Sequence, residues 1–237
     1  MLGDQIDVTE SGFWTPGRQR DGLVVVLTLV TGAIDAIGLT RLGGVFTSVM
    51  TGNMVLLGIS MAKSHVSILY HTGVAFAGYV AGSLLGARVA GHAVKDEELW
   101  PRPIVVALAL EFALIGAFAL WWELTGGAPT SGPAYAMLGL NAAALGVQSA
   151  AVLRFGISGL STTYLTGTLT QLVASFTKRR EPIQGRSVLI LLALIGGAAL
   201  GAAVALNAPK AAPLVPLGFL AFVVVFAEVA FHRRTLR

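Results

Sequence analysis

The sequence predicts an all-α, multi-pass transmembrane bundle, and composition and apolar runs carry that prediction. Of 237 residues, 55% are hydrophobic and only 12% are charged, whereas a soluble domain carries about 25% charged residues. So few charges cannot cover the surface of a soluble protein, which excludes an ordinary cytosolic enzyme and argues against nucleic acid as a partner. The apolar runs are long and do not alternate, so they favour helices in a lipid bilayer over strands.

The first 21 residues are predicted to form a cytoplasmic tail. They are polar and contain no apolar core ahead of a small-residue cleavage site, so they do not resemble a signal peptide. Arg18 and Arg20 lie directly before the first apolar run, and basic residues favour the cytoplasmic side. The termini are therefore both expected in the cytoplasm if the number of crossings is even.

Eight apolar stretches follow the tail and predict the helices in order. They cover residues 22–40, 45–62, 67–90, 102–122, 134–153, 160–176, 187–207 and 213–231. The fourth is the clearest span, because Trp100 and the pair Trp121 and Trp122 bracket it as an aromatic belt would. The second and sixth stretches are the shortest and most polar, so they are expected inside the bundle or as re-entrant segments.

The number of crossings has two solutions, six or eight. If the second and sixth stretches turn back, only Arg41, Lys63 and Lys210 lie on the outer side, whereas eight crossings leave six basic residues there. The positive-inside rule therefore favours six crossings plus two re-entrant or short polar helices. Eight crossings remain the alternative.

An internal repeat is predicted from four matches at a nearly constant offset. The first repeat covers residues 22–124 and the second 134–232, and together they form one membrane domain. The matching pairs are Gly32 to Ala36 with Gly146 to Ala150, Thr51 to Asn53 with Thr166 to Thr168, Gly78, Gly82, Gly86 and Ala90 with Ala193, Gly197, Gly201 and Ala205, and, more weakly, Glu111 with Glu228. With six crossings the second repeat would be inverted, and with eight it would be parallel.

These motifs resemble the YoaK-like family of uncharacterised bacterial inner-membrane proteins. The resemblance runs from about residue 22 to 232 and is most specific at Thr51-Gly52-Asn53 and at Thr163-Tyr-Leu-Thr-Gly-Thr168. Ser149 departs from the pattern, because an Asn is expected after Gln148. The resemblance implies about six membrane segments and an inner-membrane location, and some members carry the label of small-molecule transporter.

Two carboxylates lie deep in predicted spans. Asp35 and Glu111 would cost about 2.5–3.5 kcal/mol each if they faced lipid, so each is expected to face a partner, a cavity or another helix. Asp35 is predicted either as a proton or cation site or as a structural carboxylate bonded to hydroxyls between Thr47 and Thr51. Glu111 has the same two interpretations.

The repeated Thr-Gly motifs are the strongest candidates for a substrate pathway. Thr51, Gly52 and Asn53 in the first repeat match Thr166, Gly167 and Thr168 in the second. A glycine in mid-segment weakens a helix, and a half-helix that begins there carries partial positive charge suited to an anion or polar solute. Simple helix packing through the glycines is the alternative. Gln148 and Asn141 are further candidates to line the path.

No catalytic, metal or cofactor site is predicted. Gly156-Ile-Ser158-Gly159 resembles the serine motif of intramembrane proteases, but residues 187–207 contain no His that could act as its base. The zinc motif His-Glu-x-x-His and the phosphate-binding loop are absent from the sequence, and there is no cysteine. We therefore expect no enzyme.

The function predicted from the sequence is a transporter or channel for an unidentified small polar molecule or ion. The site would lie at the repeat interface, with alternating access and, in one form of the mechanism, proton coupling through Asp35 or Glu111. The alternative is a membrane assembly or sensor protein that transports nothing. Glycine-rich faces such as Gly78, Gly82 and Gly86 permit a homo-oligomer.

Overall fold

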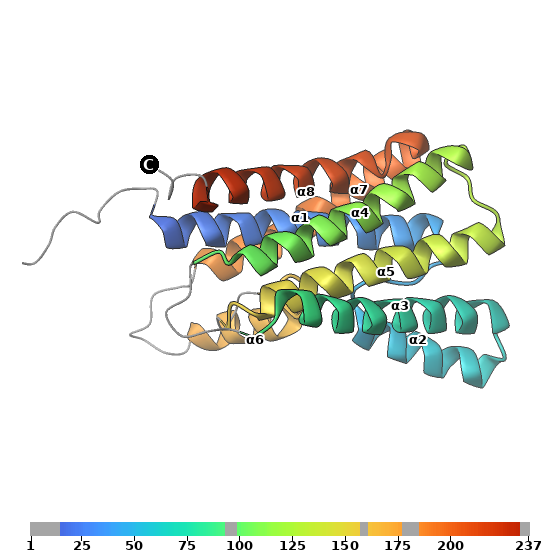
Figure 1. Ribbon diagram of the computed structural model, residues 1–237. Coiled ribbons are helices and arrows are strands. Elements are labelled where there is room, and N and C mark those ends of the chain that lie inside the picture. Colours follow the sequence, from blue (N-terminus) through green and yellow to red (C-terminus); the bar gives the residue numbers. More distant parts are fainter. Residues whose placement is uncertain (1–14, 93–98, 157–160, 177–184, 233–237) are drawn as a thin grey trace, which may run out of the picture.

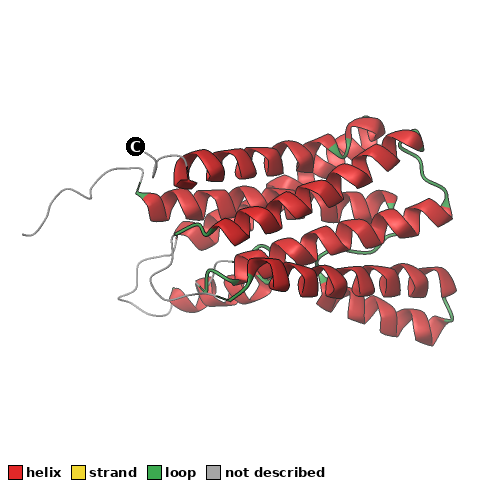
Figure 2. Ribbon diagram, viewed as in Figure 1, coloured by secondary structure: helices red, strands yellow, loops and turns green. Residues whose placement is uncertain are grey.

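The protein is a bundle of eight α-helices in a computed structural model that describes residues 15–92, 99–156, 161–176 and 185–232. No strand occurs in these ranges (Figure 2). Six helices are long and apolar enough to cross a membrane. They are α1 (Pro16–Arg41), α3 (Val66–Ala90), α4 (Arg102–Leu124), α5 (Ser131–Leu153), α7 (Gly185–Asn207) and the span Pro209–Phe231, which contains η2 (Pro209–Ala211), α8 (Leu214–Ala227) and most of η3 (Glu228–His232).

The remaining two helices, α2 (Met50–Lys63) and α6 (Leu165–Ser175), are too short to cross. They have 14 and 11 residues, or about 21 Å and about 17 Å at 1.5 Å per residue, against a hydrocarbon core of about 30 Å. α2 follows α1 through a loop that returns toward the middle of the bundle, and α2 and α6 run in opposite directions from there (Figure 1). The six-crossing prediction is therefore confirmed by helix length.

The first helix begins earlier than the apolar pattern predicts. It starts at Pro16, inside the segment predicted as a polar tail, because proline is favoured in the first turn of a helix. The rest of that tail, residues 1–14, lies outside the described residues. The two short helices α2 and α6, hereafter the half-helices, begin later than predicted, at Met50 and Leu165 in place of 45 and 160.

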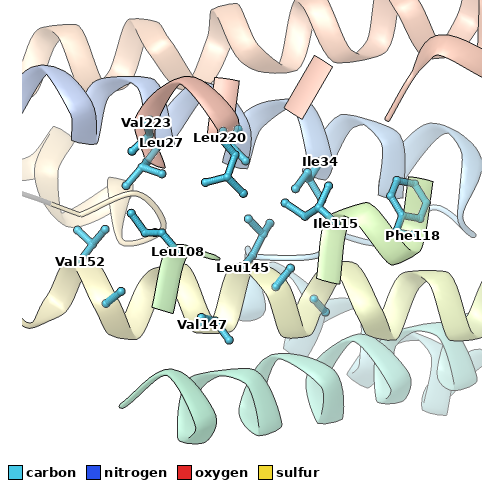
Figure 3. Packing of buried hydrophobic residues seen from close by; sticks show 14 of the residues in the cluster. Leu27, Ile34, Leu108, Ile115, Phe118, Leu145, Val147, Val152, Leu220 and Val223 are labelled. Carbon is cyan, nitrogen blue, oxygen red and sulfur yellow. The ribbon is translucent and has the colours of Figure 1, made fainter. Parts of the chain in front are cut away.

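The two innermost helices are α1 and α5. Of the most apolar 18-residue stretch of each helix, 72% is buried in α1 and 61% in α5, against 22% in α3. Their core faces meet those of α4 and α8 in one hydrophobic cluster (Figure 3). This arrangement leaves the outer faces of α3, α4, α7 and α8 to face lipid.

Glycines allow α3 to pack on α5, and α7 on α1, at backbone distance. A Cβ on Gly82 would meet the backbone of Ala143, and one on Gly197 would meet the backbone of Leu29. Gly78 and Gly86 likewise face α5, at Gly139 and Val147. These glycine faces are therefore filled within the chain, and the homo-oligomer through them stays a prediction.

The aromatic belt predicted for α4 is wrong for two of its three tryptophans. Trp100 and Trp122 are fully buried, whereas Trp121 is partly exposed. The Trp100 ring lies 5.1 Å from that of Phe155, and Trp122 Nε1 donates a hydrogen bond to the carbonyl oxygen of Pro209 at 2.8 Å. These two residues fasten helix ends together and do not anchor the protein in the headgroup region.

Candidate functional site

The N-termini of α2 and α6 open onto one pocket. It has a volume of about 550 Å³, and its walls come from both half-helices, the loops before them and α3. The lining residues are Ser48, Val49, Met50, Thr51, Tyr79, Thr163, Tyr164, Leu165, Thr166, Gly167 and Thr170. Most of the polar groups among them are hydroxyls, which can both donate and accept hydrogen bonds.

The first turns of α2 and α6 are left uncapped by side chains. Neither the N-cap residue Val49 nor Tyr164 makes a side-chain cap hydrogen bond. The first backbone N–H groups of a helix have no partner within the helix, and the helix dipole adds partial positive charge at this end. Two such ends at one pocket favour an anion or the electronegative end of a polar solute.

Asp35 of α1 holds the loop that leads into α2. Its Oδ1 accepts hydrogen bonds from the Thr47 N–H and hydroxyl, both at 2.7 Å, and from the Ser48 N–H at 2.8 Å. Its Oδ2 accepts the Ser48 hydroxyl at 2.5 Å. The structural role considered for Asp35 is thus present, and all four bonds orient the loop beside the pocket.

The loop can reverse direction because of two glycines and an asparagine. Gly43 and Gly44 adopt φ angles of 101° and 75°, which residues with a Cβ rarely adopt. Asn53, on the first turn of α2, then bridges the loop: its Oδ1 accepts from the Phe46 N–H at 3.0 Å and its Nδ2 donates to the Phe46 carbonyl at 2.7 Å. Asn53 is therefore buried behind the pocket wall and does not line it.

Hydroxyl groups hold the segment from Ser161 to Tyr164, which leads directly into α6. The Ser149 hydroxyl, from the position of α5 that matches Asp35, lies 3.1 Å from the Thr163 hydroxyl. Ser161 Oγ accepts from the N–H groups of Thr163 and Tyr164, at 3.3 and 2.8 Å. The hydroxyl of Thr162 is buried and has no hydrogen-bond partner in the described part of the chain.

The predicted site residues separate into two places. Thr51, Thr166 and Gly167 line the pocket, and Gly52 lies beside it against the side chains of Phe46 and Val49. Thr168, matching Asn53, is buried, and its hydroxyl donates to the carbonyl of Tyr164 in its own helix at 3.4 Å. Their participation in a solute pathway stays a prediction.

Glu111 and Gln148 lie apart from the pocket, in the hydrophobic interior of the bundle. Both side chains are fully buried. Gln148 Nε2 donates to the Thr31 hydroxyl at 2.8 Å and to the Leu27 carbonyl at 3.3 Å, which ties α5 to α1. The carboxylate oxygens of Glu111 have no hydrogen-bond partner among the described residues.

Sequence reasoning missed several pocket residues. Ser48, Thr163 and Tyr164 lie inside the two motifs that it singled out, so the motif boundaries could have been widened to include them. Tyr79 of α3 had no signal, because its place depends on how closely the glycines beside it let α3 approach α5.

The described residues hold no cluster of three or more His, Asp or Glu that could bind a metal ion. Ser158, the serine of the protease-like tetrapeptide, lies outside the described residues. The expectations of no cofactor and no enzymatic activity stay predictions.

Comparison with known proteins links this architecture to a family. A family model described as "Protein of unknown function (DUF1275)" matches residues 23–226. The chain is 33% identical over 187 residues to "UPF0700 transmembrane protein YoaK" of Bacillus subtilis (strain 168), which covers 76% of this chain and 80% of the relative. No solved structure matches the chain.

Proposed function

The chain belongs to the DUF1275 family of membrane proteins, and from that premise we propose that it is a transporter or channel for a small polar molecule or ion. One observation carries the proposal: two half-membrane helices direct their uncapped N-termini at a common hydroxyl-lined pocket. Half-helices of this kind bind solutes near the bilayer midplane in transporters, because their N–H groups and dipoles replace water around the solute.

An internal duplication supports a site shared by two repeats. Gly82 of α3 faces Ala143 of α5, and in the matching pair of helices, at a nearly equal offset, Gly197 of α7 faces Leu29 of α1. The half-helices α2 and α6 also occupy matching places and run in opposite directions from the pocket (Figure 1). Each proposed repeat has three crossings, so the second is inverted relative to the first.

The orientation we propose puts both termini in the cytoplasm. Contacts between Arg20 and the Phe155 ring, and between Asp21 and Arg186, gather the start of α1, the end of α5 and the start of α7 at one end of the bundle. The described basic residues at this end are Arg18, Arg20, Arg88, Arg102, Arg154 and Arg186, against Arg41, Lys63 and Lys210 at the other. The positive-inside rule supports the richer end as cytoplasmic.

The test is solute flux into proteoliposomes, with glycerol, urea, formate and nitrate as probes. We expect at least one probe to enter faster than it enters protein-free vesicles. Gly167→Leu would drive a side chain against the Tyr164 ring at the pocket wall, so this variant should lose at least nine tenths of the flux. Gly52→Leu should reduce flux less, because a Cβ there comes only into van der Waals contact with the loop side chains of Phe46 and Val49.

The matched control is Gly58→Leu. Gly58 lies on α2 with open space where its Cβ would be, so flux should stay within a factor of two of the wild type. Full flux in both Gly52→Leu and Gly167→Leu would remove the pocket from the pathway. Four probes that all enter no faster than in protein-free vesicles would contradict a channel or transporter for solutes of this class.

A further inference from the structure

Fully buried polar side chains interrupt the hydrophobic interior of α1, α4 and α5. They include Thr31, Glu111 and Gln148, besides Thr28 on α1 and Asn141 on α5. Thr31, Glu111 and Gln148 each follow one core residue and precede another by three or four positions, so each shares a helix face with its two core neighbours, which Figure 3 labels. The flanking residues are Leu27 and Ile34 on α1, Leu108 and Ile115 on α4, and Leu145 and Val152 on α5.

The Gln148 amide has a fixed orientation. The Thr31 hydroxyl donates to the carbonyl of Leu27 at 3.2 Å, so its oxygen accepts the bond from Gln148 Nε2. A second bond runs from the same nitrogen to the Leu27 carbonyl. The amide oxygen, Gln148 Oε1, therefore points away from these acceptors, and it is buried with no hydrogen-bond partner in the described ranges.

The register of α4 against α5 brings this oxygen toward Glu111. The contact between Trp100 and Phe155 aligns the start of α4 with the end of α5. Counting equal rises along the two antiparallel helices puts Glu111 opposite about position 144. Helical side chains tilt toward the N-terminus of their own helix, so Glu111 and Gln148, which start about one turn apart, tilt toward each other.

The helices packed against α4 offer Glu111 no cation at this depth. They are α5, α8 and α3. The ionisable residues of α5 are at its ends, Tyr135 and the C-cap residue Arg154; α8 has none between Leu214 and Ala227, with Glu228 just beyond; α3 carries Tyr70, His71, Tyr79 and Arg88; and on α4 itself Arg102 and Glu123 are at the ends.

The ionisable groups nearest to Glu111 on α3, and Asp35 on α1, bond to other residues or line the pocket. His71 Nδ1 bonds the Ser67 carbonyl at 2.7 Å and its ring packs on Tyr135. Tyr79 lines the pocket. Asp35 on α1 is held by Thr47 and Ser48. An ionised Glu111 would thus be a buried charge with no cation beside it among the described residues, facing the lone pairs of an amide oxygen, which is a costly arrangement.

We propose that Glu111 is a proton-binding site, in which the protonated carboxyl donates its O–H to Gln148 Oε1. Protonation forms one O–H bond with a proton from water, and release returns that proton to water, with no other covalent change. A proton needs no cavity, which suits a group packed among leucine and isoleucine side chains. Resting on the transport function proposed above, the inference further assigns this proton as the coupling ion.

Infrared spectroscopy of the full chain in lipid nanodiscs tests the site without any solute. At neutral pH the wild type should show the carbonyl stretch of a protonated carboxylic acid, and Glu111→Gln should lose that band. Glu123→Gln, which changes an exposed glutamate on the same helix, should keep it. Gln148→Met should keep the band but shift it to higher frequency, because the acceptor of the O–H is gone.

Two other outcomes would overturn the assignment of Glu111 as a proton-binding site. If Glu111→Gln removes no protonated-acid band, Glu111 is ionised in the wild type. If added sodium shifts a carboxylate band that Glu111→Gln removes, the site binds a metal ion and not a proton. Both readings stand whether or not any probe solute crosses the membrane.

Coupling is tested separately in proteoliposomes with an imposed proton gradient. The gradient should raise the initial rate of uptake of the transported probe at least fivefold over the rate without a gradient, in the wild type and in Glu123→Gln. It should leave the rate of uptake by Glu111→Gln unchanged. Gradient-driven uptake by Glu111→Gln would overturn the coupling role even where the infrared band assigns the proton to Glu111. Absence of flux for every probe contradicts the proposed function and the coupling role with it, while the infrared result still decides the proton site.

Discussion

The loops that lead into α2 and α6 approach the same pocket but are fastened differently. The first is held by a carboxylate, Asp35, which accepts four hydrogen bonds, and by the Asn53 side chain, which bridges the backbone of Phe46. Among its described residues, the second has Ser149 at the place of Asp35, in contact with the Thr163 hydroxyl, and Ser161, whose Oγ accepts from the N–H groups of Thr163 and Tyr164. Bonds to a charged acceptor are stronger than those between neutral groups, so the first loop is the more firmly held.

The Thr162 hydroxyl, which has no partner among the described residues, follows from this difference. At the repeat offset of 115, Thr162 matches Thr47, whose hydroxyl donates to Asp35. A serine has a single side-chain oxygen, and that of Ser149 already donates to the Leu145 carbonyl and contacts Thr163. In its described part, the second loop thus keeps the donors of the first but lacks the carboxylate acceptor, so we expect its displacement to cost less.

The largest expected effect separates the two half-helices by side of the membrane. The chain has no cysteine, so Ser64→Cys at the end of α2 and Phe176→Cys at the end of α6 each provide a single exposed thiol. A membrane-impermeant maleimide should label Ser64→Cys fully in intact cells, and should label Phe176→Cys only after lysis. Labelling of both variants from the same side would contradict the inverted arrangement.

Much of the fold could be predicted from hydropathy, whereas the fastening of the loops could not. The six spans have lengths and compositions that lipid requires, and the polar content of residues 160–176 indicated a segment that does not cross. Residues 45–49, however, are as apolar as a helix start. They form a loop because Asp35, 12 residues earlier, binds Thr47, and contacts over such a separation leave no local pattern.

The motifs of the candidate site could be predicted from the sequence, but the separation of its residues into two places could not. The repeat located Thr51 and Thr166, which line one pocket. Glu111 and Gln148 were grouped with them because buried polar residues in spans suggest function. Their separation from the pocket depends on which face of α4 and α5 meets α1, and sequence spacing does not specify the partner of a helix face.

The next effect is on stability and compares matched alanine substitutions. Asp35→Ala leaves two buried N–H groups and two hydroxyls of Thr47 and Ser48 without their acceptor, which should lower the free energy of unfolding by about 3 kcal/mol. Ser149→Ala removes a neutral contact with Thr163 and a bond to the Leu145 carbonyl of its own helix, and should cost about 1 kcal/mol. Equal shifts in the thermal unfolding midpoint of the two variants, measured in one detergent, would show that the loops are equally fastened.

The smallest expected effect is a gain in stability, which should follow when an acceptor is added to the second loop at the position that Asp35 occupies in the first. Ser149→Asn adds an amide oxygen at the position of α5 that matches Asp35, as an acceptor for the buried Thr162 hydroxyl, which has no partner in the described ranges. A new neutral hydrogen bond to a buried donor should raise the free energy of unfolding by up to about 1 kcal/mol. Ser149→Val is the control. Its side chain offers no hydrogen-bond acceptor, so it should not raise the free energy of unfolding. Thermal unfolding of both variants against the wild type measures the difference. If Ser149→Asn melts at or below the Ser149→Val midpoint, the missing acceptor is not what distinguishes the second loop from the first, and the comparison must then rest on the Asn53 bridge alone.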